Sequence, residues 1–412
     1  MKLTYVMVVG NLTAMTPLVV NPGGQLGLEE IIGRQQEIRK YWKVLGRQGL
    51  VLSAERRIGK THIVRKMHEE GREGFATFYQ DLESVHGLME LVRALYRSVD
   101  RQLSGLQKAK SKAIAAWSTI LPTKLGALDV PNAQNNWKVL LVEAVNDVLE
   151  AVDPANKVVL MWDEFPLMLY NLHKREGGAN SVIQLLDVLR SLRQQHGVRL
   201  RFLFTGSIGL HLVLRTLRLA GNANESVNDM QQETVPPMRK EEAVELASRL
   251  LCGLEQPPAA ATVESLARRI YTAVEGFPYY IHHLVDRLGA LERSPTAADV
   301  ASTAEALVCA DDDPAQLSYY LKRISTYYAP EEARLSLLVL DAIAFRDGGT
   351  AMEELLNLVR HQDPDVNDEQ IRDTCLLLRR DHYLTLEPNS EGVMVHDFRW
   401  GVVRHWWRRN RS

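Results

Sequence analysis

The feature that most constrains the fold of this chain is the segment 54–61, which reads Ala-Glu-Arg-Arg-Ile-Gly-Lys-Thr. It follows the apolar, strand-like run Gly49–Ser53 and precedes a helix-like run over residues 63–70. A glycine-containing loop that joins a strand to a helix and ends in Lys-Thr is the pattern of a phosphate-binding loop. Backbone N–H groups and the positive end of the helix surround an anion in such a loop. The segment therefore predicts an α/β fold with a phosphate site.

The residue types of this loop have distinct chemical roles. Gly59 lets backbone N–H groups approach phosphate oxygens, the ammonium of Lys60 reaches the β- and γ-phosphates, and the Thr61 hydroxyl is a Mg²⁺ ligand. The neighbouring side chains belong to the same turn or to the first turn of the helix. The residues predicted to bind nucleotide here are Arg57, Ile58, Gly59, Lys60, Thr61 and His62.

Ala54 stands where the usual pattern has its first glycine. Alanine adopts positive φ less readily than glycine, but this position is compatible with alanine, so we expect nucleotide binding to survive. Taken alone, the loop also fits an ordinary strand–turn–helix that carries a surface lysine. A second motif is needed to separate these two interpretations.

That second motif is the apolar run over residues 158–162, which ends in Asp163 and Glu164. A buried strand rarely ends in adjacent carboxylates unless they hold a cation or water. In this interpretation Asp163 binds Mg²⁺ through its water shell, and Glu164 orients and activates an attacking water as a general base. The alternative is that Asp163 caps a helix over residues 166–172.

A further apolar run, Leu200–Thr205, also ends in a polar residue. In a sheet ordered like a nucleotide-binding one, this strand end faces the crevice that holds the γ-phosphate. Two interpretations of Thr205 remain open. Either its hydroxyl hydrogen-bonds the γ-phosphate or the lytic water, which makes it a catalytic residue beside Lys60 and Glu164, or it is a simple turn residue.

Strand-like and helix-like segments alternate over residues 26–235. The strand candidates have the apolar composition of strands buried on both faces of a parallel sheet, and they are Gly49–Ser53, Phe75–Asp81, 158–162 and Leu200–Thr205. Residues 181–195 carry one apolar face at helical spacing. The predicted fold class is therefore α/β, with a three-layer core around a parallel sheet.

The strand signal disappears after Pro236. Amphipathic helices separated by proline-containing breaks predict a helical domain over residues 236–312. Residues 313–412 read helix, helix, helix, hairpin, helix, which is the order of a winged helix-turn-helix. The predicted organisation is thus a leader (1–25), a core (26–235), a helical domain and a winged helix.

Composition and charge narrow the classes of function. A net charge of −2 gives no global signal for nucleic acid, so any such contact needs a local basic patch. No segment has the roughly 18 apolar residues of a membrane-spanning helix, and no cleavage site for export follows the apolar start of the chain. Cys252, Cys309 and Cys375 lie far apart without metal-ligand spacing, so we interpret them as reduced packing thiols. We therefore expect a cytoplasmic protein with no membrane contact.

Together these motifs resemble the AAA+ and STAND groups of P-loop ATPases, especially the archaeal-type ATPases with a winged helix that are related to the Orc/Cdc6 initiators. Residues 56–61 resemble the Walker A loop of that family, residues 162–164 its Walker B motif, and residues 205–207 its sensor-1 strand end. The resemblance runs from about residue 30 to the C-terminus. It implies an AAA+-like core with a helical lid, ATP or ADP as the ligand, and Mg²⁺ as the cofactor.

Other site residues are implied by this resemblance alone. Gly33 and Arg34 match the family motif that lies over the adenine, and Pro278 matches a lid proline that packs near it. His396 stands where STAND proteins carry a histidine that contacts the β-phosphate of bound ADP, with Val395 inserted in the motif. The alternative for His396 is a hydrogen-bonded histidine that caps the last helix.

The sequence leaves the purpose of such an ATPase open. Nucleotide exchange or hydrolysis could move the winged helix so that a protein partner or a second copy responds. The winged helix could instead bind DNA through its third helix or through the arginines of its last helix. A third interpretation makes the nucleotide purely structural. No arginine finger is marked among Arg199, Arg201, Arg215 and Arg218, and residues 105–132 carry no motif that assigns them a role.

Overall fold

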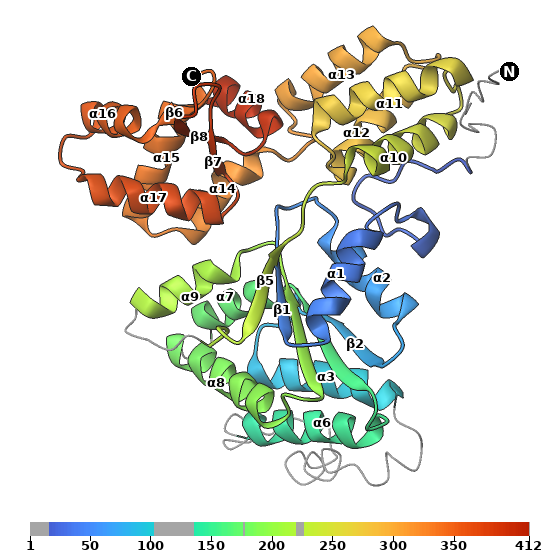
Figure 1. The fold of residues 1–412 in the computed structure, drawn as a ribbon, viewed down its shortest axis with the longest axis vertical. Coiled ribbons are helices and arrows are strands. Elements are labelled where there is room, and N and C mark those ends of the chain that lie inside the picture. The colour runs from blue at the N-terminus through green and yellow to red at the C-terminus, as the bar shows by residue number, and fades with distance from the viewer. Residues whose placement is uncertain (1–15, 103–135, 176–177, 220–225, 412) are drawn as a thin grey trace, which may run out of the picture. The chain divides into compact units, whose positions relative to one another are not determined.

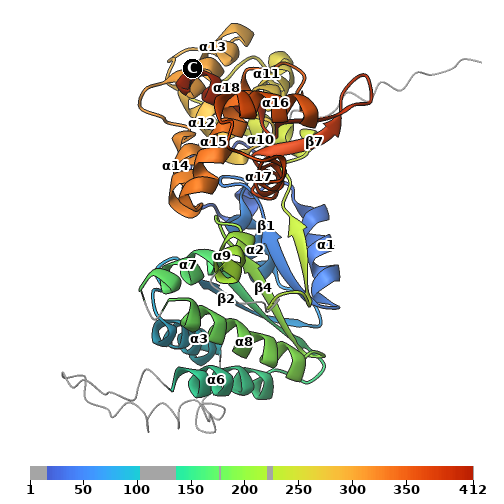
Figure 2. The same ribbon diagram turned by 90° about the vertical axis from the view of Figure 1, so that its left-hand side faces the viewer.

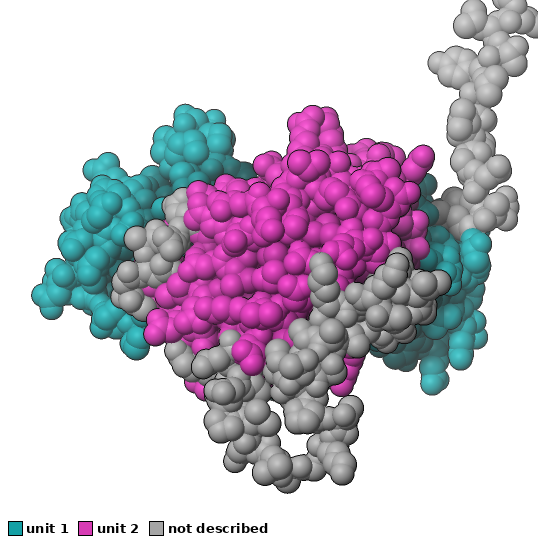
Figure 3. All heavy atoms as spheres, turned by 90° about the horizontal axis from the view of Figure 1, so that it is seen from below, with its two compact units in different colours: residues 1–33, 237–412 teal, residues 34–236 magenta. Residues whose placement is uncertain are grey.

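The computed structural model describes residues 16–102, 136–175, 178–219 and 226–411. The chain forms two compact units, which Figure 3 shows in different colours. One unit is Arg34–Pro236, and the other combines Met1–Gly33 with Pro237–Ser412. Each unit has its own fold and is described by itself.

The unit Arg34–Pro236 is built on a five-stranded parallel sheet in the order β2-β3-β4-β1-β5. The strands are β1 (Gly49–Ser53), β2 (Phe75–Asp81), β3 (Lys157–Asp163), β4 (Leu200–Thr205) and β5 (Met230–Thr234). Since β4 lies between β1 and β3, the three strands that carry the predicted site residues are neighbours. The strand order thus gathers the candidate site at one edge of the sheet.

Helices cover both faces of this sheet (Figure 1 and Figure 2). One face packs against α1 (Gln35–Leu45) and α2 (Lys60–Glu70). The opposite face carries the other described helices of this unit, α3 (Leu88–Gln102), α6 (Trp137–Ala151), α7 (Phe165–Arg175), α8 (Ala179–Gln195) and α9 (Leu210–Leu219). The three-layer α/β architecture predicted from the sequence is confirmed.

An aromatic cluster forms the core beneath the carboxyl ends of β3 and β4. The rings of Phe165 and Phe204 stack with centroids 4.1 Å apart, and Trp162 packs against both of them and against Phe202. All four side chains are completely buried. Because close-packed aromatic rings resist displacement, this cluster provides a rigid base for the residues that follow the two strands.

The second unit contains residues 16–33 and a helical region where the sequence predicted a lid. It contains a short 3₁₀ helix (Leu28–Glu30) and the helices α10 (Lys240–Cys252), α11 (Ala260–Val274), α12 (Pro278–Gly289) and α13 (Ala297–Cys309). Pro278 is the first residue of α12, a position where the missing N–H of proline has no cost. The breaks between these helices coincide with the proline-containing segments of the sequence.

The rest of this unit has the element order of a winged helix. It consists of α14 (Ser318–Tyr327), α15 (Pro330–Ala344), β6 (Thr350–Ala351), α16 (Met352–Gln362), α17 (Asp368–Arg380), β7 (Leu384–Pro388), β8 (Met394–Phe398) and α18 (Gly401–Asn410). The strands form an antiparallel sheet in the order β6-β8-β7. The sequence did not predict α14 or the short strand β6, whereas the other elements follow the predicted order of three helices, a hairpin and a last helix.

Two sequence expectations fall outside the described residues. They are the export signal considered for the start of the chain, within residues 1–15, and the unassigned segment 105–132. Among the described helices, none combines the length and apolar character that a membrane crossing requires.

Candidate functional site

The carboxyl ends of four neighbouring strands define the candidate site. In the register of the sheet, Leu52 is opposite Thr205, and Asp163 is opposite Asp81. The chain leaves β1 into the loop that precedes α2, and it leaves β3 through Glu164 into α7. Predicted residues from separate segments therefore meet at one edge, where parallel sheets with covered faces bind ligands.

The loop between β1 and α2 adopts a backbone suited to anions. Arg57 and Gly59 have φ of 69° and 90°, which is the left-handed region, and Gly59 is the N-cap of α2. Alternating right- and left-handed residues turn successive N–H groups toward one side of the chain. Ala54 is not among the positive-φ residues of the described chain. Alanine replaces the usual glycine at that position without backbone strain, as the sequence expectation required.

Lys60 and Arg34 hold this loop from two sides. The Lys60 ammonium is nearly buried and donates to the carbonyls of Ala54 and Glu55 at 2.9 and 2.8 Å. The buried guanidinium of Arg34 donates to the carbonyl of Ile58 at 2.8 Å and to that of Pro236 at 2.7 Å. Lys60 thus places a positive charge within the loop, and Arg34 fixes the loop to the start of α1.

Asp163 and Thr61 form a direct pair at this edge. The Thr61 hydroxyl hydrogen-bonds the Asp163 carboxylate, and the Tyr79 hydroxyl donates to Asp163 Oδ2 at 3.4 Å. Asp163 is only 2% exposed, and burial raises the pKa of its carboxyl, as does the negative charge of Asp81. The hydrogen bond from Thr61 and the charge of Lys60 oppose this rise in pKa. A desolvated carboxylate beside a second acid favours a bound cation.

Glu164 is held in place by Ser207. Its two carboxylate oxygens accept from the Ser207 backbone N–H at 3.0 and 2.9 Å, and Oε2 also accepts from the Ser207 hydroxyl at 2.9 Å. Glu164 itself has a φ of 55°, an uncommon conformation for a non-glycine residue. Gly206 makes the approach possible, because a Cβ there would lie 2.8 Å from Cδ of Pro166 and 3.3 Å from Glu164 Oε2.

The pKa of the Glu164 carboxyl reflects the same contacts. Burial raises this pKa above its usual value, the hydrogen bonds from Ser207 lower it, and the charge of Asp163 raises it again. The net effect is a raised pKa, which brings the group closer to the range in which a carboxylate works as a general base.

Thr205 lies at the end of β4 with its side chain only 1% exposed. Its hydroxyl oxygen makes no hydrogen bond to any residue that the structure describes. A buried hydroxyl without a partner has a considerable free-energy cost, so native proteins rarely keep one unless a ligand or water completes it. This observation favours a ligand-binding role for Thr205 over a simple turn residue.

The combined donor set suits a magnesium–phosphate complex. Thr61, Asp163 and Glu164 offer hydroxyl and carboxylate oxygens, the ligands that a hard divalent cation prefers. The N–H groups of the loop and the Lys60 ammonium offer charge of the opposite sign for an anion. Oxygen ligands for Mg²⁺ and positively charged groups for phosphate thus lie at the same edge of the sheet.

Comparisons with known proteins support this description at the level of fold. No family model matches the chain, and no curated protein matches it. Among solved structures, a Walker-type ATPase of Pyrococcus abyssi is similar with a TM-score of 0.59 and 16% identity, covering 92% of this chain and 97% of that one. The Orc2 protein of Aeropyrum pernix, solved as ADPNP–ADP complexes, gives a TM-score of 0.50 and 14% identity, covering 90% of each chain. The chain shares the fold of these two proteins.

Two of the arginines considered as fingers have structural contacts within this fold. Arg199 donates to the carbonyls of Leu149 and Val152 at 2.9 Å each, at the C-terminal end of α6. Arg201 is buried and donates to the carbonyl of Leu45 at 3.0 Å. Their guanidinium groups therefore fix helix ends. Arg215 and Arg218 both lie on α9.

The remaining predicted residues lie at the start or in the body of the second unit. Gly33 has a φ of 70° and ends this unit's first segment, directly before Arg34. Pro278 begins α12, and its neighbour Phe277 packs edge-on against Trp400 at 4.8 Å. His396 is buried in β8, which is the central strand of the small sheet.

His396 has a distinctive environment. Its Nδ1 makes no hydrogen bond to a described residue, and burial lowers the pKa of its imidazole. The alternative role for His396, a hydrogen-bonded cap of the last helix, lacks support, since α18 begins at Gly401 with Trp400 as its N-cap. The backbone N–H groups of Gly401 and Val402 donate instead to the carboxylate of Glu275, at 3.0 and 3.1 Å.

Sequence reasoning assigned no role to Ser207, Asp81 or Tyr79. Ser207 was visible only as the last residue of the run 205–207, and its contact with Glu164 depends on the fold. Asp81 carried a clearer signal, because it ends a strand with a carboxylate as Asp163 does. The charge of Asp81 acts on the pKa of Asp163, so it belongs to the electrostatics of the site.

Proposed function

We propose that this protein binds ATP with Mg²⁺, hydrolyses it, and acts as a nucleotide-dependent switch for a protein partner. The observation that carries the proposal is the meeting of Lys60, Thr61, Asp163 and Glu164 beside Thr205, whose buried hydroxyl has no partner among the described residues. The fold is shared with solved ATPases. Three free cysteines agree with a cytoplasmic location.

In the binding step the loop N–H groups and Lys60 take the phosphates. The Lys60 ammonium exchanges the carbonyls of Ala54 and Glu55 for β- and γ-phosphate oxygens. Mg²⁺, when bound, neutralises phosphate charge and orients the β- and γ-phosphates. Thr61 and Asp163 would hold it, Thr61 directly and Asp163 through water. Arg34 and the side chains next to the loop are proposed to contact the base and sugar, and Gly33 and Pro278 keep the roles that the family resemblance implies.

In the hydrolytic step Glu164 acts on water. Its carboxylate accepts a proton as the water oxygen bonds to the γ-phosphorus and the bond to the β–γ bridging oxygen breaks, leaving that electron pair on ADP. Thr205 donates its hydroxyl to the γ-phosphate or to the water. Lys60 stabilises the negative charge that develops on the transferred group.

The second unit contains a connection through which nucleotide state could reach the winged helix. Glu275 ends α11 beside Gly276, Phe277 and Pro278, and its carboxylate caps the N-terminus of α18. An anion at a helix N-terminus is stabilised by the orphan N–H groups and by the helix dipole. A movement of residues 276–278 would therefore displace α18. We propose that nucleotide exchange changes the position of α18 in this way and that the partner responds to the change.

The contacts of the terminal arginines favour a protein partner over DNA. Arg404 and Arg408 donate to the carbonyl of Ala344 and pair with Asp347, and Arg411 pairs with Asp341. The first turn of α17 is acidic. Guanidinium groups already paired with carboxylates are poorly placed to bind phosphates. DNA binding through the winged helix remains the second candidate function.

Mass and nucleotide content of the purified full-length protein, measured before and after ATP–Mg²⁺ is added, test the proposal. We expect co-purified ADP or ready uptake of ATP, together with a change in mass or in the capture of a protein partner on exchange. An increase in mass that requires duplex DNA would replace the switch with the DNA-binding role. If the protein contains and binds no nucleotide under any of these conditions, the proposal is overturned.

Replacing Ser207 with alanine should raise ATP turnover by about three- to tenfold, because Glu164 loses one hydrogen bond that lowers its basicity. Steady-state phosphate release, measured at saturating ATP–Mg²⁺, checks this. Ser207→Thr keeps the hydroxyl and should behave like the parent protein. Slower turnover in Ser207→Ala with ATP still bound would mean that Ser207 positions Glu164 for the reaction.

A further inference from the structure

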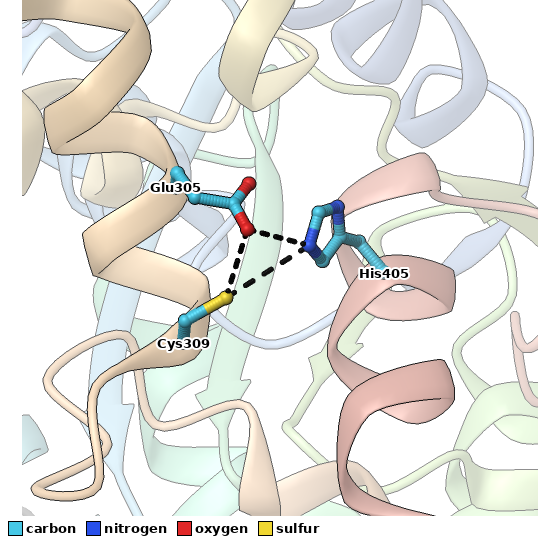
Figure 4. Close-up of side chains that lie close together, drawn as sticks. All are labelled: Glu305, Cys309 and His405. Carbon is cyan, nitrogen blue, oxygen red and sulfur yellow. Dashed lines mark hydrogen bonds and ion pairs between the residues drawn. The ribbon is translucent and has the colours of Figure 1, made fainter. Parts of the chain in front are cut away.

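A cluster of three potential metal ligands lies away from the ATPase site, in the second unit. Glu305 and Cys309 are one helical turn apart on α13, and His405 faces them from α18 (Figure 4). Glu305 Oε1 is 3.2 Å from both Cys309 Sγ and His405 Nε2, and Cys309 Sγ is 3.9 Å from His405 Nε2. Cys309 and His405 are separated by 96 residues, which is why linear spacing gave no indication of a site.

These separations match those of a tetrahedral zinc site. With the usual bonds of about 2.3 Å to sulfur and about 2.0–2.2 Å to nitrogen and oxygen, tetrahedral angles place ligand atoms about 3.4–3.6 Å apart. The three observed separations, 3.2, 3.2 and 3.9 Å, differ from these by a few tenths of an ångström. Small rotations of partly exposed side chains are enough to close that difference.

The contacts converge on one point, which distinguishes this cluster from a catalytic triad. In a cysteine–histidine–acid triad the acid orients the histidine through the ring nitrogen opposite the one that faces the thiol. Here Glu305 and Cys309 both contact Nε2 of His405. Burial and the Glu305 carboxylate raise the pKa of the Cys309 thiol, whereas an activated nucleophile has a lowered thiol pKa.

The charges around the cluster are compatible with a divalent cation. Arg409 lies close enough to lower the pKa of both Glu305 and Cys309. That positive charge opposes a cation but also favours the thiolate, which is the form that binds metal. A thiolate and a carboxylate together neutralise a divalent ion, and the partly exposed position leaves room for water as a fourth ligand.

We propose that Glu305, Cys309 and His405 form a zinc site that joins α13 to α18, with water in the fourth position. The mixed sulfur, nitrogen and oxygen donors suit zinc, a borderline-soft ion, better than magnesium, which prefers oxygen. On binding, Cys309 releases its proton to solvent. The ion would tie the lid to α18, the helix whose N-terminus Glu275 caps, and its three ligands are separate from those of the nucleotide site.

Cobalt is the probe that tests this site in the full-length, tag-free protein after treatment with a chelator. Titration with Co²⁺ should give one equivalent with thiolate-to-cobalt charge-transfer absorption and the visible bands of a tetrahedral ion, and added Zn²⁺ should remove them. The described ATPase site has no cysteine, so Co²⁺ bound there gives no thiolate band. Cys309→Ser should abolish the band, while the matched control Cys252→Ser, on α10, should keep it.

His405→Ala should weaken Zn²⁺ binding at least tenfold, since loss of even an outer partner of a ligand costs about 10- to 100-fold. Without metal, Cys309→Ser and His405→Ala should unfold at the same temperature as the parent, because the replaced side chains are partly exposed. A saturating titration without a thiolate band, or a band that survives in Cys309→Ser, would refute the site. Neither result would bear on ATP hydrolysis, which is assayed separately with Mg²⁺.

Discussion

Replacing Glu164 with glutamine should lower the rate of ATP hydrolysis by about 100- to 10,000-fold, the usual contribution of a general base. Glutamine preserves the size of the side chain and can still contact Ser207, but it cannot accept the proton of the attacking water. Binding of ATP–Mg²⁺ should remain close to that of the parent, because Lys60 and the loop are unchanged. Single-turnover hydrolysis and equilibrium binding of a fluorescent ATP analogue separate the two effects.

The pH dependence gives this prediction a second test. A base works only when deprotonated, and the pKa of the Glu164 carboxyl is raised by burial. Turnover of the parent should therefore increase as pH rises through that raised pKa and then level off. In Glu164→Gln this contribution disappears, so the acid side of the pH profile should flatten.

Glu143→Gln, a change to a partly buried carboxylate on α6, is the matched control and should retain parental turnover. If Glu164→Gln hydrolyses ATP at the parental rate, another group activates the water and the assignment of the base is wrong. If neither the parent protein nor Glu164→Gln hydrolyses ATP, with or without partners, the enzyme proposal fails. Nucleotide binding can still be tested in that case.

The central strands could be located from sequence because they are buried on both faces. β3 and β4 are almost unbroken apolar runs that end in polar residues, a pattern that also marks the sheet edge carrying the site. The edge strand β5 was missed, since its sequence Met-Gln-Gln-Glu-Thr is polar after the one buried residue, Met230. Its Glu233 pairs with the exposed Lys40 of α1.

The candidate site residues were chosen from motif chemistry, but the residues that contact them could not be predicted in this way. Ser207 lies 43 residues from Glu164, and only the left-handed turn at Glu164 together with Gly206 brings the two into contact. Glu275 lies 126 residues before Gly401, yet its carboxylate caps the helix that begins at Gly401. Such contacts depend on how strand ends and loops are placed in three dimensions, which local propensity does not encode.

The charge of the last helix could not be interpreted from the sequence alone. The arginines of the last helix look like a basic surface in the sequence, but the structure pairs several of them with carboxylates and carbonyls of the same unit. Trp407 is fully buried and its indole N–H donates to Asp341 at 2.8 Å. The last helix is thus anchored to its own domain by the side chains that seemed suited to nucleic acid.

Lys60→Ala should weaken the affinity for ATP–Mg²⁺ by about 30-fold or more. The ammonium is nearly buried within the loop, and loss of one partner of a buried charged contact costs about 2–5 kcal/mol. The folded state should survive, because alanine is a strong helix former at the first position of α2. Calorimetric titration with ATP–Mg²⁺ measures the loss directly.

Lys66→Ala provides the matched control, since Lys66 is on the same helix, is similarly buried, and pairs with Glu70 at 3.7 Å instead of entering the loop. It should bind ATP like the parent. Equal loss in both variants would point to a general weakening of α2, and unchanged affinity in Lys60→Ala would remove the phosphate site from this loop. If the affinity for ATP–Mg²⁺ falls in Lys60→Ala and not in Lys66→Ala, the lost binding energy belongs to the Lys60 ammonium. The strand order and the left-handed turn at Gly59 place that ammonium at the edge of the sheet.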